Sequence, residues 1–197
     1  MNFIDEFSKI VEAMRENYQF PLIWIGLLWL VHIINITMKY RLNYLGIIPR
    51  HVFGLLGIFF YPFLHGSFEH LFLNSLPAYI LINLVSLYGR ETFYALSIFI
   101  ILTSGLMVWL LGRHAIHIGA SGLMMGYWGF LVMNAVHQGT AMAIILGFIC
   151  IYYLGSMIMN VLPTQKGASW EGHFFGCLSG MAYGYLIPYF SYFSKLL

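Results

Sequence analysis

Residues 92–111 have the sequence TFYALSIFIILTSGLMVWLL, a run of twenty without a charged side chain. An α-helix of about 20 apolar residues is long enough to cross the hydrocarbon core of a bilayer. The whole 197-residue chain is similar, because charged residues make up only 8% of it and its mean hydropathy is +0.81. A soluble domain carries about 25% charged residues, and the runs are too unbroken for the alternating strands of a membrane β-barrel. The sequence therefore predicts an all-α polytopic membrane protein.

Five further apolar runs of bilayer-spanning length flank this one. The six predicted transmembrane helices are residues 21–38, 71–88, 92–111, 120–136, 141–162 and 173–193. The uncharged stretch 52–64 is too short to cross comfortably, so residues 39–69 are expected to form one long loop, partly embedded in the membrane, on a single side. Because the sequence contains no linker, residues 21–197 are predicted to form one transmembrane domain.

The first twenty residues differ from the rest, because they hold four of the seven acidic residues. Phe3, Phe7, Ile10 and Met14 recur at helical spacing. This pattern predicts an N-terminal amphipathic helix over residues 1–20 that lies on the membrane surface, and the acidic start is not typical of a signal peptide. A net charge of +2 without a basic stripe argues against nucleic-acid binding. Lysines and arginines divide almost evenly between the two sides, so charge does not set the orientation.

Polar residues converge on one face of the predicted bundle. With six spans, alternate loops share a face, and these are residues 39–69, 112–119 and 163–172. Beside these loops lie His70 and Asn74, which are four residues apart and share one side of a helix. Ser121 begins the fourth span, where free backbone N–H groups point outward, and His173 begins the sixth. A hydroxyl, an imidazole that can take its proton, and donors for a developing oxyanion are the components of acyl transfer through a serine.

Glycines recur every fourth residue on two of the predicted spans. They are Gly172, Gly176, Gly180 and Gly184 on the sixth span, and Gly122 and Gly126 on the fourth. Small residues at this interval let two transmembrane helices approach closely. We therefore expect these two faces to pack together and to bring His173 to Ser121.

In order and spacing, these residues resemble the rhomboid family of intramembrane serine proteases, in the six-helix form common in bacteria. The family pattern on the second span is matched by His65, His70 and Asn74. The Gly-x-Ser-Gly motif of the fourth span is matched by Gly119, Ser121 and Gly122, and the His-x-x-Gly-x-x-x-Gly motif of the sixth by His173, Gly176 and Gly180. Each motif is short, but together they cover most of the chain and are highly specific.

This resemblance implies a serine endopeptidase with a Ser-His dyad in a rhomboid-like bundle. Ser121 would be the nucleophile, and His173 the general base and acid. The oxyanion hole would comprise the side chains of His70 and Asn74 with backbone N–H groups at Ser121 and Gly122.

The resemblance also implies a substrate and a location. The substrate would be a transmembrane helix of another membrane protein, cleaved in the bilayer through an acyl-enzyme, and residues 39–69 would match the family's membrane-embedded first loop. Both termini of this multi-pass protein would lie in the cytoplasm, and the active site would open from the bacterial inner membrane toward the periplasm or exterior. His65 and Ser67 are expected to hold hydrolytic water at the mouth of the site. No metal or cofactor is expected, and the oligomeric state stays open.

Carboxylates are scarce near the predicted site. After the first twenty residues the acidic residues are Glu69, Glu91 and Glu171. Glu91 falls on the far side, and the other two begin helices, where a solvated or dipole-stabilising role is expected. We therefore predict a dyad, with His173 oriented by packing rather than by a carboxylate. In many relatives an aromatic residue four positions after the serine stacks on this histidine, but here the residue is Met125.

Other functional classes fit the sequence less well. It lacks the His-Glu-x-x-His motif of a metalloprotease, and its spans lack the two aspartates of an intramembrane aspartyl protease. A small transporter stays an alternative, although the chain shows no inverted repeat and no charge within its predicted spans. A non-catalytic rhomboid-like adaptor that binds membrane helices is the other alternative, although such relatives typically lack the serine or the histidine.

Overall fold

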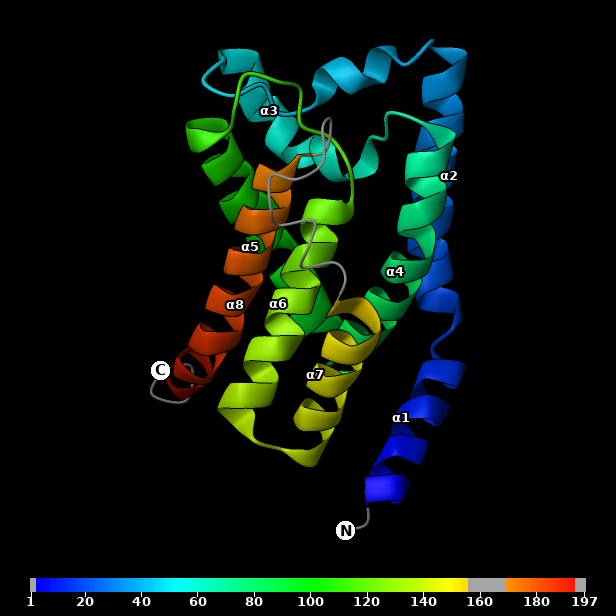
Figure 1. The fold of residues 1–197 in the computed structure, drawn as a ribbon, viewed down its shortest axis with the longest axis vertical. Coiled ribbons are helices and arrows are strands. Elements are labelled where there is room, and N and C mark those ends of the chain that lie inside the picture. The colour runs from blue at the N-terminus through cyan, green and yellow to red at the C-terminus, as the bar shows by residue number, and fades with distance from the viewer. Residues whose placement is uncertain (1–2, 156–168, 194–197) are drawn as a thin grey trace.

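A computed structural model describes residues 3–155 and 169–193, and its regular structure in these ranges is helical (Figure 1). The eight α-helices of the described residues are α1 (Phe3–Glu16), α2 (Gln19–Thr37), α3 (Val52–Phe60), α4 (Phe68–Ser86), α5 (Arg90–Leu111), α6 (Ser121–Gln138), α7 (Ala141–Leu154) and α8 (Trp170–Phe193). Two 3-10 helices, η1 (Arg41–Leu45) and η2 (Tyr61–Phe63), lie between α2 and α4. The predicted all-α class is confirmed over this part of the chain.

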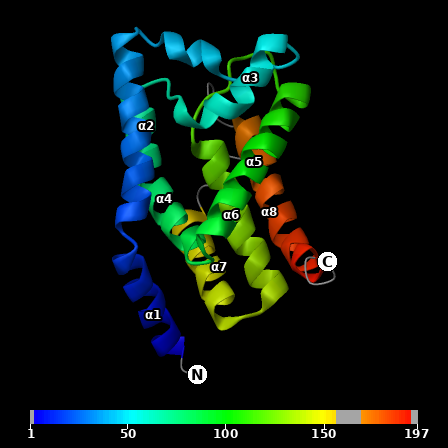
Figure 2. The ribbon, with the colours of Figure 1, turned by 180° about the vertical axis from the view of Figure 1, so that it is seen from behind.

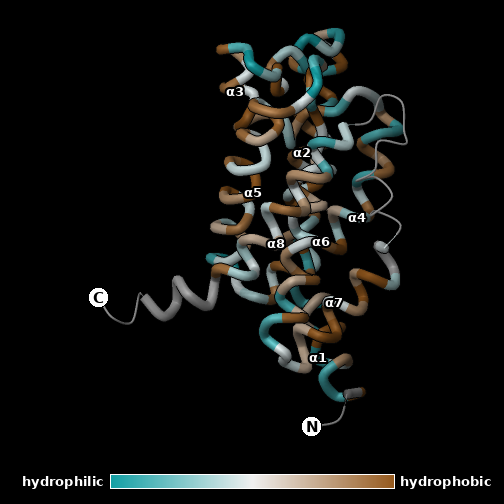
Figure 3. Tube along the Cα trace, turned by 60° about the vertical axis from the view of Figure 1, so that its left-hand side comes forward, coloured by the Kyte–Doolittle hydropathy of each residue, from teal (hydrophilic) through white to brown (hydrophobic). Residues whose placement is uncertain are grey.

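Six of these helices, α2 and α4 to α8, occupy the six segments predicted to cross the membrane. Among the described residues, α2, α4 and α5 are long and apolar enough to span a bilayer by length and composition. Helix α7 ends at Leu154, and the remainder of the predicted span 141–162 lies outside the described residues. Figure 3 shows α7 coloured mostly hydrophobic, whereas α1 carries hydrophilic residues. The count of six spans stays a prediction.

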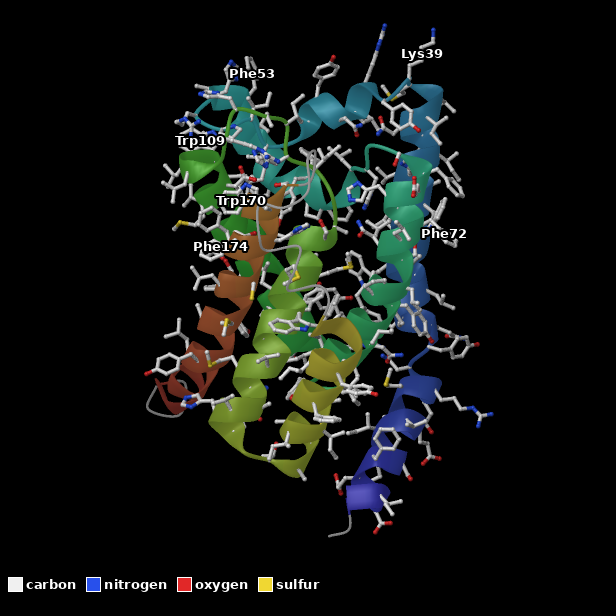
Figure 4. All side chains as sticks on the ribbon, viewed as in Figure 1. Lys39, Phe53, Phe72, Trp109, Trp170 and Phe174 are labelled. Atoms are coloured by element: carbon white, nitrogen blue, oxygen red, sulfur yellow. The ribbon has the colours of Figure 1, made fainter. Side chains whose placement is uncertain are left out.

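The connection between α2 and α4 folds back on itself at one end of the bundle, where α3 packs against α5 (Figure 1). Gly57 of α3 lies so close to the carbonyl of Gly46 that a side chain there would overlap it. The indole Nε1 of Trp109 in α5 donates to the carbonyl of His51 at 2.9 Å, and Figure 4 shows Trp109 and Phe53 at this same end. Phe53 is 73% exposed, so an apolar surface faces outward. The embedding of this loop in lipid stays a prediction that the exposed apolar surface supports.

Helix α1 is attached to the bundle by both apolar and polar contacts. Ile10 is buried in the main hydrophobic core. Beyond the end of α1, Asn17 donates to the side chain of Asn83 in α4 at 2.9 Å, and Asn83 donates in turn to the carbonyl of Met14 at 3.1 Å. The amphipathic helix predicted over residues 1–20 is thus a helix over 3–16, and its place on a membrane surface stays a prediction.

Helix α6 lies at the centre of the bundle and contacts α8, α7, α4 and α5. The views from the front and from behind agree, with α5 and α8 on one side of α6 and α7 on the other (Figure 1, Figure 2). Met125, Phe130 and Leu131 of α6 are completely buried. Since interior side chains pack at crystal-like density, this core holds the first residue of α6, Ser121, in a defined position.

Candidate active site

Glycines bring the backbones of α6 and α8 into direct contact. A side chain at Gly176 would overlap the carbonyl of Gly122, and one at Gly180 would overlap the carbonyl of Gly126. Gly126 has a second neighbour that the sequence did not indicate, because its own missing Cβ faces Ile100 of α5 at 2.6 Å. The absence of side chains along this contact allows the two helices to lie at backbone distance.

This helix contact places the predicted dyad within hydrogen-bond distance. His173 Nε2 lies 2.7 Å from Ser121 Oγ, although the two residues are 52 positions apart. Ser121 is the first residue of α6 and is half-buried, and His173 lies in the first turn of α8 and is 7% exposed. The geometry is that of a serine hydroxyl beside a base able to accept its proton.

His70 of α4 and Ser121 lie on either side of a glycine with a positive φ. Gly119 has φ +123°, and the point where its Cβ would lie is 3.4 Å from His70 Nε2 and 3.5 Å from Ser121 Oγ. The backbone N–H of Gly119 donates to the carbonyl of Tyr61 at 2.8 Å. A side chain at this position would be strained at its positive φ and crowded by the imidazole, so glycine is required for His70 and Ser121 to approach each other.

Asn74 lies one turn after His70 in α4, so both side chains point to one side of that helix. The amide nitrogen Nδ2 of Asn74 is buried and has no hydrogen-bond partner in the structure. A buried donor without a partner is unusual in a folded protein. The backbone N–H groups of Ser121 and Gly122 belong to the first turn of α6, where intrahelical acceptors are lacking. Donors of this kind are what an oxyanion hole uses.

His65 and Ser67, both expected at the mouth of the site, differ in exposure. Ser67 is exposed and caps α4, accepting from the backbone N–H of His70 at 3.1 Å. His65 is completely buried, and its Nε2 accepts from the backbone N–H of Ala120 at 3.4 Å. Burial lowers the pKa of His65 to about 3, with smaller contributions from the positive forms of His70 and His32. His65 is therefore a neutral residue behind the site and not an open, solvent-facing one.

The two nearby carboxylates have different environments. Glu69 is exposed, whereas Glu171 is 3% exposed and its Oε1 lies 3.4 Å from Nε of Arg113. Of the two roles expected for Glu171, the solvated one is therefore wrong, whereas its place in the first turn of α8 is compatible with the dipole-stabilising one. Sequence reasoning did not single out Arg113, because a partner 58 residues away in a loop leaves no periodic signal.

Met125 stands where many relatives carry an aromatic residue. It is completely buried in the main core.

A small cavity borders the dyad. Its volume is about 10 Å³, and Tyr61 and Ser104 line it together with Ser121, Gly122 and His173. This is space for about one water molecule. Within residues 3–155 and 169–193, the structure contains no cluster of three or more histidine, cysteine, aspartate or glutamate side chains suited to a metal ion.

Comparison with known proteins places this arrangement in a family. The model of the Rhomboid domain matches residues 52–190, which include the whole site described above. The chain belongs to the rhomboid family. Rhomboid membership and the apolar helices together make it a membrane protein.

Among curated proteins, this rhomboid is similar to mycobacterial chains that are named only as uncharacterized proteins. It is 32% identical over 175 residues to one from Mycobacterium bovis and to one from Mycobacterium tuberculosis, covering 84% of this chain and 73% of each of those proteins. A protein of Mycobacterium leprae is 31% identical over 175 residues, covering 84% of this chain and 69% of that protein.

Proposed function

We propose that this rhomboid is an intramembrane serine endopeptidase that cleaves transmembrane segments of other membrane proteins. The observation that carries the proposal is the 2.7 Å separation between Ser121 Oγ and His173 Nε2. His173 takes the hydroxyl proton as Ser121 Oγ attacks the scissile carbonyl carbon, and a tetrahedral oxyanion forms. When the C–N bond breaks, His173 returns that proton to the leaving amine, and an acyl-enzyme remains. Water, activated by His173, then hydrolyses the ester.

The groups around Ser121 suit stabilisation of that oxyanion. Asn74 Nδ2 is a buried donor without a partner, so it can bind a negative oxygen without first breaking a bond inside the protein. Donors oriented before the reaction stabilise developing charge more than solvent does, because they need not reorganise. His70 and the first-turn N–H groups of α6 supply the other donors. Their placement and the membership of the rhomboid family support these proposed roles.

The position of the site among apolar helices supports the proposed substrate. A transmembrane helix has its carbonyls hydrogen-bonded internally, so it must unwind locally before Ser121 can attack one of them. Small or helix-breaking residues at the cleavage point should therefore help. We further propose a six-span topology in the bacterial inner membrane, with both termini in the cytoplasm and the site open toward the periplasm or exterior. In Figure 1 the start of α6 and the start of α8 lie toward the end of the molecule opposite α1.

A comparison of the wild type with Ser121→Ala tests the proposed function. The purified protein in detergent is incubated with a fluorophosphonate probe and, separately, with a model single-span substrate. Wild type is expected to bind the probe covalently and to cleave the substrate, and Ser121→Ala to do neither. Labelling or cleavage that persists in Ser121→Ala would contradict the assignment. Absence of both in wild type would favour the adaptor or the transporter.

Asn74→Ala tests the oxyanion hole. Loss of one such donor costs about 2.7–4 kcal/mol of transition-state stabilisation, or about 10²–10³ in kcat. We expect kcat to fall by this factor and KM to change little, because the donor binds a charge that exists only after attack. The measurement is steady-state cleavage of the model substrate. An unchanged kcat would remove Asn74 from the oxyanion hole.

A further inference from the structure

Four residues tie the loop between α5 and α6 to the start of α8. Arg113 and His117 belong to the loop, and Ser169 and Glu171 to the start of α8. We call this group the α8 clasp. Two of its members, His117 and Ser169, line the small cavity that borders the dyad. The sequence did not indicate the clasp, and the catalytic scheme above gives it no role.

Hydrogen-bond directions in the clasp follow from the carbonyl oxygen at one end. His117 Nε2 lies 3.1 Å from the carbonyl of Arg113, and a carbonyl only accepts, so Nε2 carries the proton. Burial lowers the pKa of His117, so the ring is neutral and Nδ1 is an acceptor. Nδ1 lies 2.6 Å from Ser169 Oγ, and the serine hydroxyl therefore donates to it. The loop and α8 are thus joined by a directed chain of hydrogen bonds.

The same serine hydroxyl caps α8. Ser169 Oγ accepts from the backbone N–H of Gly172 at 3.3 Å, and the carbonyl of Ser169 accepts from the backbone N–H of His173 at 3.3 Å. Capping by a serine satisfies a first-turn donor and sets where the helix begins. Because His173 lies in this turn, the cap determines where its imidazole lies along the axis of α8 relative to Ser121.

Arg113 and Glu171 form the second half of the clasp. Glu171 Oε1 accepts from the backbone N–H of Arg113 at 3.3 Å and pairs with its Nε at 3.4 Å. Glu171 and His173 are two residues apart, and residues at that interval do not face each other on a helix. The contacts of Glu171 thus join the first turn of α8 to the loop through Arg113.

The loop is itself anchored near the serine. His117 exchanges two backbone hydrogen bonds with Ile47, at 2.9 and 3.0 Å. Gly119, two residues on, donates to the carbonyl of Tyr61, and Ser121 follows. The segment 113–121 thus ends at Ser121, and its residues Arg113 and His117 also contact the start of α8, the helix that carries His173.

We propose that the α8 clasp positions His173 against Ser121, and that Ser169, His117, Arg113 and Glu171 are positioning residues for acylation. This inference rests on the proposed function, because it assigns the clasp to the same dyad. The glycine contact sets how closely α6 and α8 approach, whereas the clasp sets the axial position and rotation of the first turn of α8. Such a constraint matters for acylation, since displacement of a catalytic group by about 1 Å can cost about 10²-fold in rate.

The test measures the rate and the final extent of fluorophosphonate labelling for Ser169→Ala, His117→Ala and Glu171→Ala. We expect each to slow labelling and to lower kcat by about 10- to 100-fold, with KM unchanged and labelling still reaching completion. Misfolding would instead lower the final extent of labelling. Ser169→Thr keeps the hydroxyl and is expected to restore the rate to near wild type.

Thr140→Ala is the matched control. Thr140 caps α7 in the same way, accepting from the backbone N–H of Ala143 at 3.2 Å, but in a different part of the bundle. This variant loses an equivalent cap and is expected to label at the wild-type rate. If it slows labelling as much as Ser169→Ala does, the effect is general destabilisation and the proposal is overturned.

Hydrogen–deuterium exchange gives a readout that does not depend on activity. Backbone amides of residues 170–176 are expected to exchange faster in Ser169→Ala and His117→Ala than in wild type or Thr140→Ala. Unchanged exchange there, or wild-type labelling rates in all three clasp variants, would overturn the clasp while leaving the protease assignment intact. A wild type that labels no better than Ser121→Ala would overturn the protease assignment, and with it the positioning role.

Discussion

Gly180→Ala is expected to destabilise the bundle strongly and to push α6 and α8 apart. The added Cβ would overlap the backbone carbonyl of Gly126, and a backbone atom cannot rotate away as a side chain can. Overpacking of a core typically lowers the free energy of unfolding by about 1–3 kcal/mol and occasionally by more. Because the overlap here is with a backbone atom, we expect a loss at the upper end of this range. Separation of α6 from α8 also takes His173 away from Ser121. We therefore expect a large fall in thermal midpoint together with loss of fluorophosphonate labelling.

Gly26→Ala provides the control for that variant. Gly26 lies in the middle of α2, and a Cβ there would meet no atom within 4 Å. The same chemical change should raise helix stability by up to about 1 kcal/mol, because alanine is the better helix former. We expect normal labelling and an unchanged or slightly higher thermal midpoint. Equal behaviour of the two variants would show that the α6–α8 contact does not limit stability.

His173→Ala is expected to reduce the rate of fluorophosphonate labelling by about 10²–10⁴-fold, the usual contribution of a positioned acid–base group. The imidazole is the base that activates Ser121 Oγ, and without it the hydroxyl keeps the low reactivity of an ordinary alcohol. Cleavage of the model substrate should fall at least as far, because His173 also protonates the leaving amine. The thermal midpoint should change little compared with the rate.

His137→Ala is the matched control for the histidine change. His137 lies near the other end of α6 from Ser121, where its ring stacks on Tyr185 with centroids 5.1 Å apart. Its removal also deletes an imidazole from the α6–α8 region but leaves the dyad intact, so labelling at the wild-type rate is expected. If His173→Ala labels as fast as His137→Ala, another group activates Ser121 and the dyad assignment fails.

Local patterns are sufficient to predict the long helices. Uncharged runs of about 20 residues mark the segments that became α2 and α4 to α8, because apolar composition over a bilayer length is a property of each segment alone. The stretch 52–64 was predicted not to cross, and α3 and η2 occupy it at one end of the bundle (Figure 1). The amphipathic pattern near the N-terminus predicted α1 but not its attachment, since the contact between Asn17 and Asn83 joins residues 66 positions apart.

The order of short motifs along the chain predicted which residues the site would contain. Because alternate loops share a face, the sequence predicts that His70, Ser121 and His173 lie on one side of the bundle, and the structure brings them together. Exposure was less predictable. His65 was expected near water, yet it is completely buried behind Ala120, because its environment depends on how α4 and α6 approach each other.

By itself, the sequence determined that the chain is helical and apolar, that it carries glycine faces on two helices, and that it has few carboxylates with which to build a catalytic triad. Only the tertiary structure decided that Glu171 is buried against Arg113 and that Ser169 links the cap of α8 to His117. Composition and periodicity report the environment of a segment. A contact between single polar residues 52 or 58 positions apart exists only once the backbones on either side are in place.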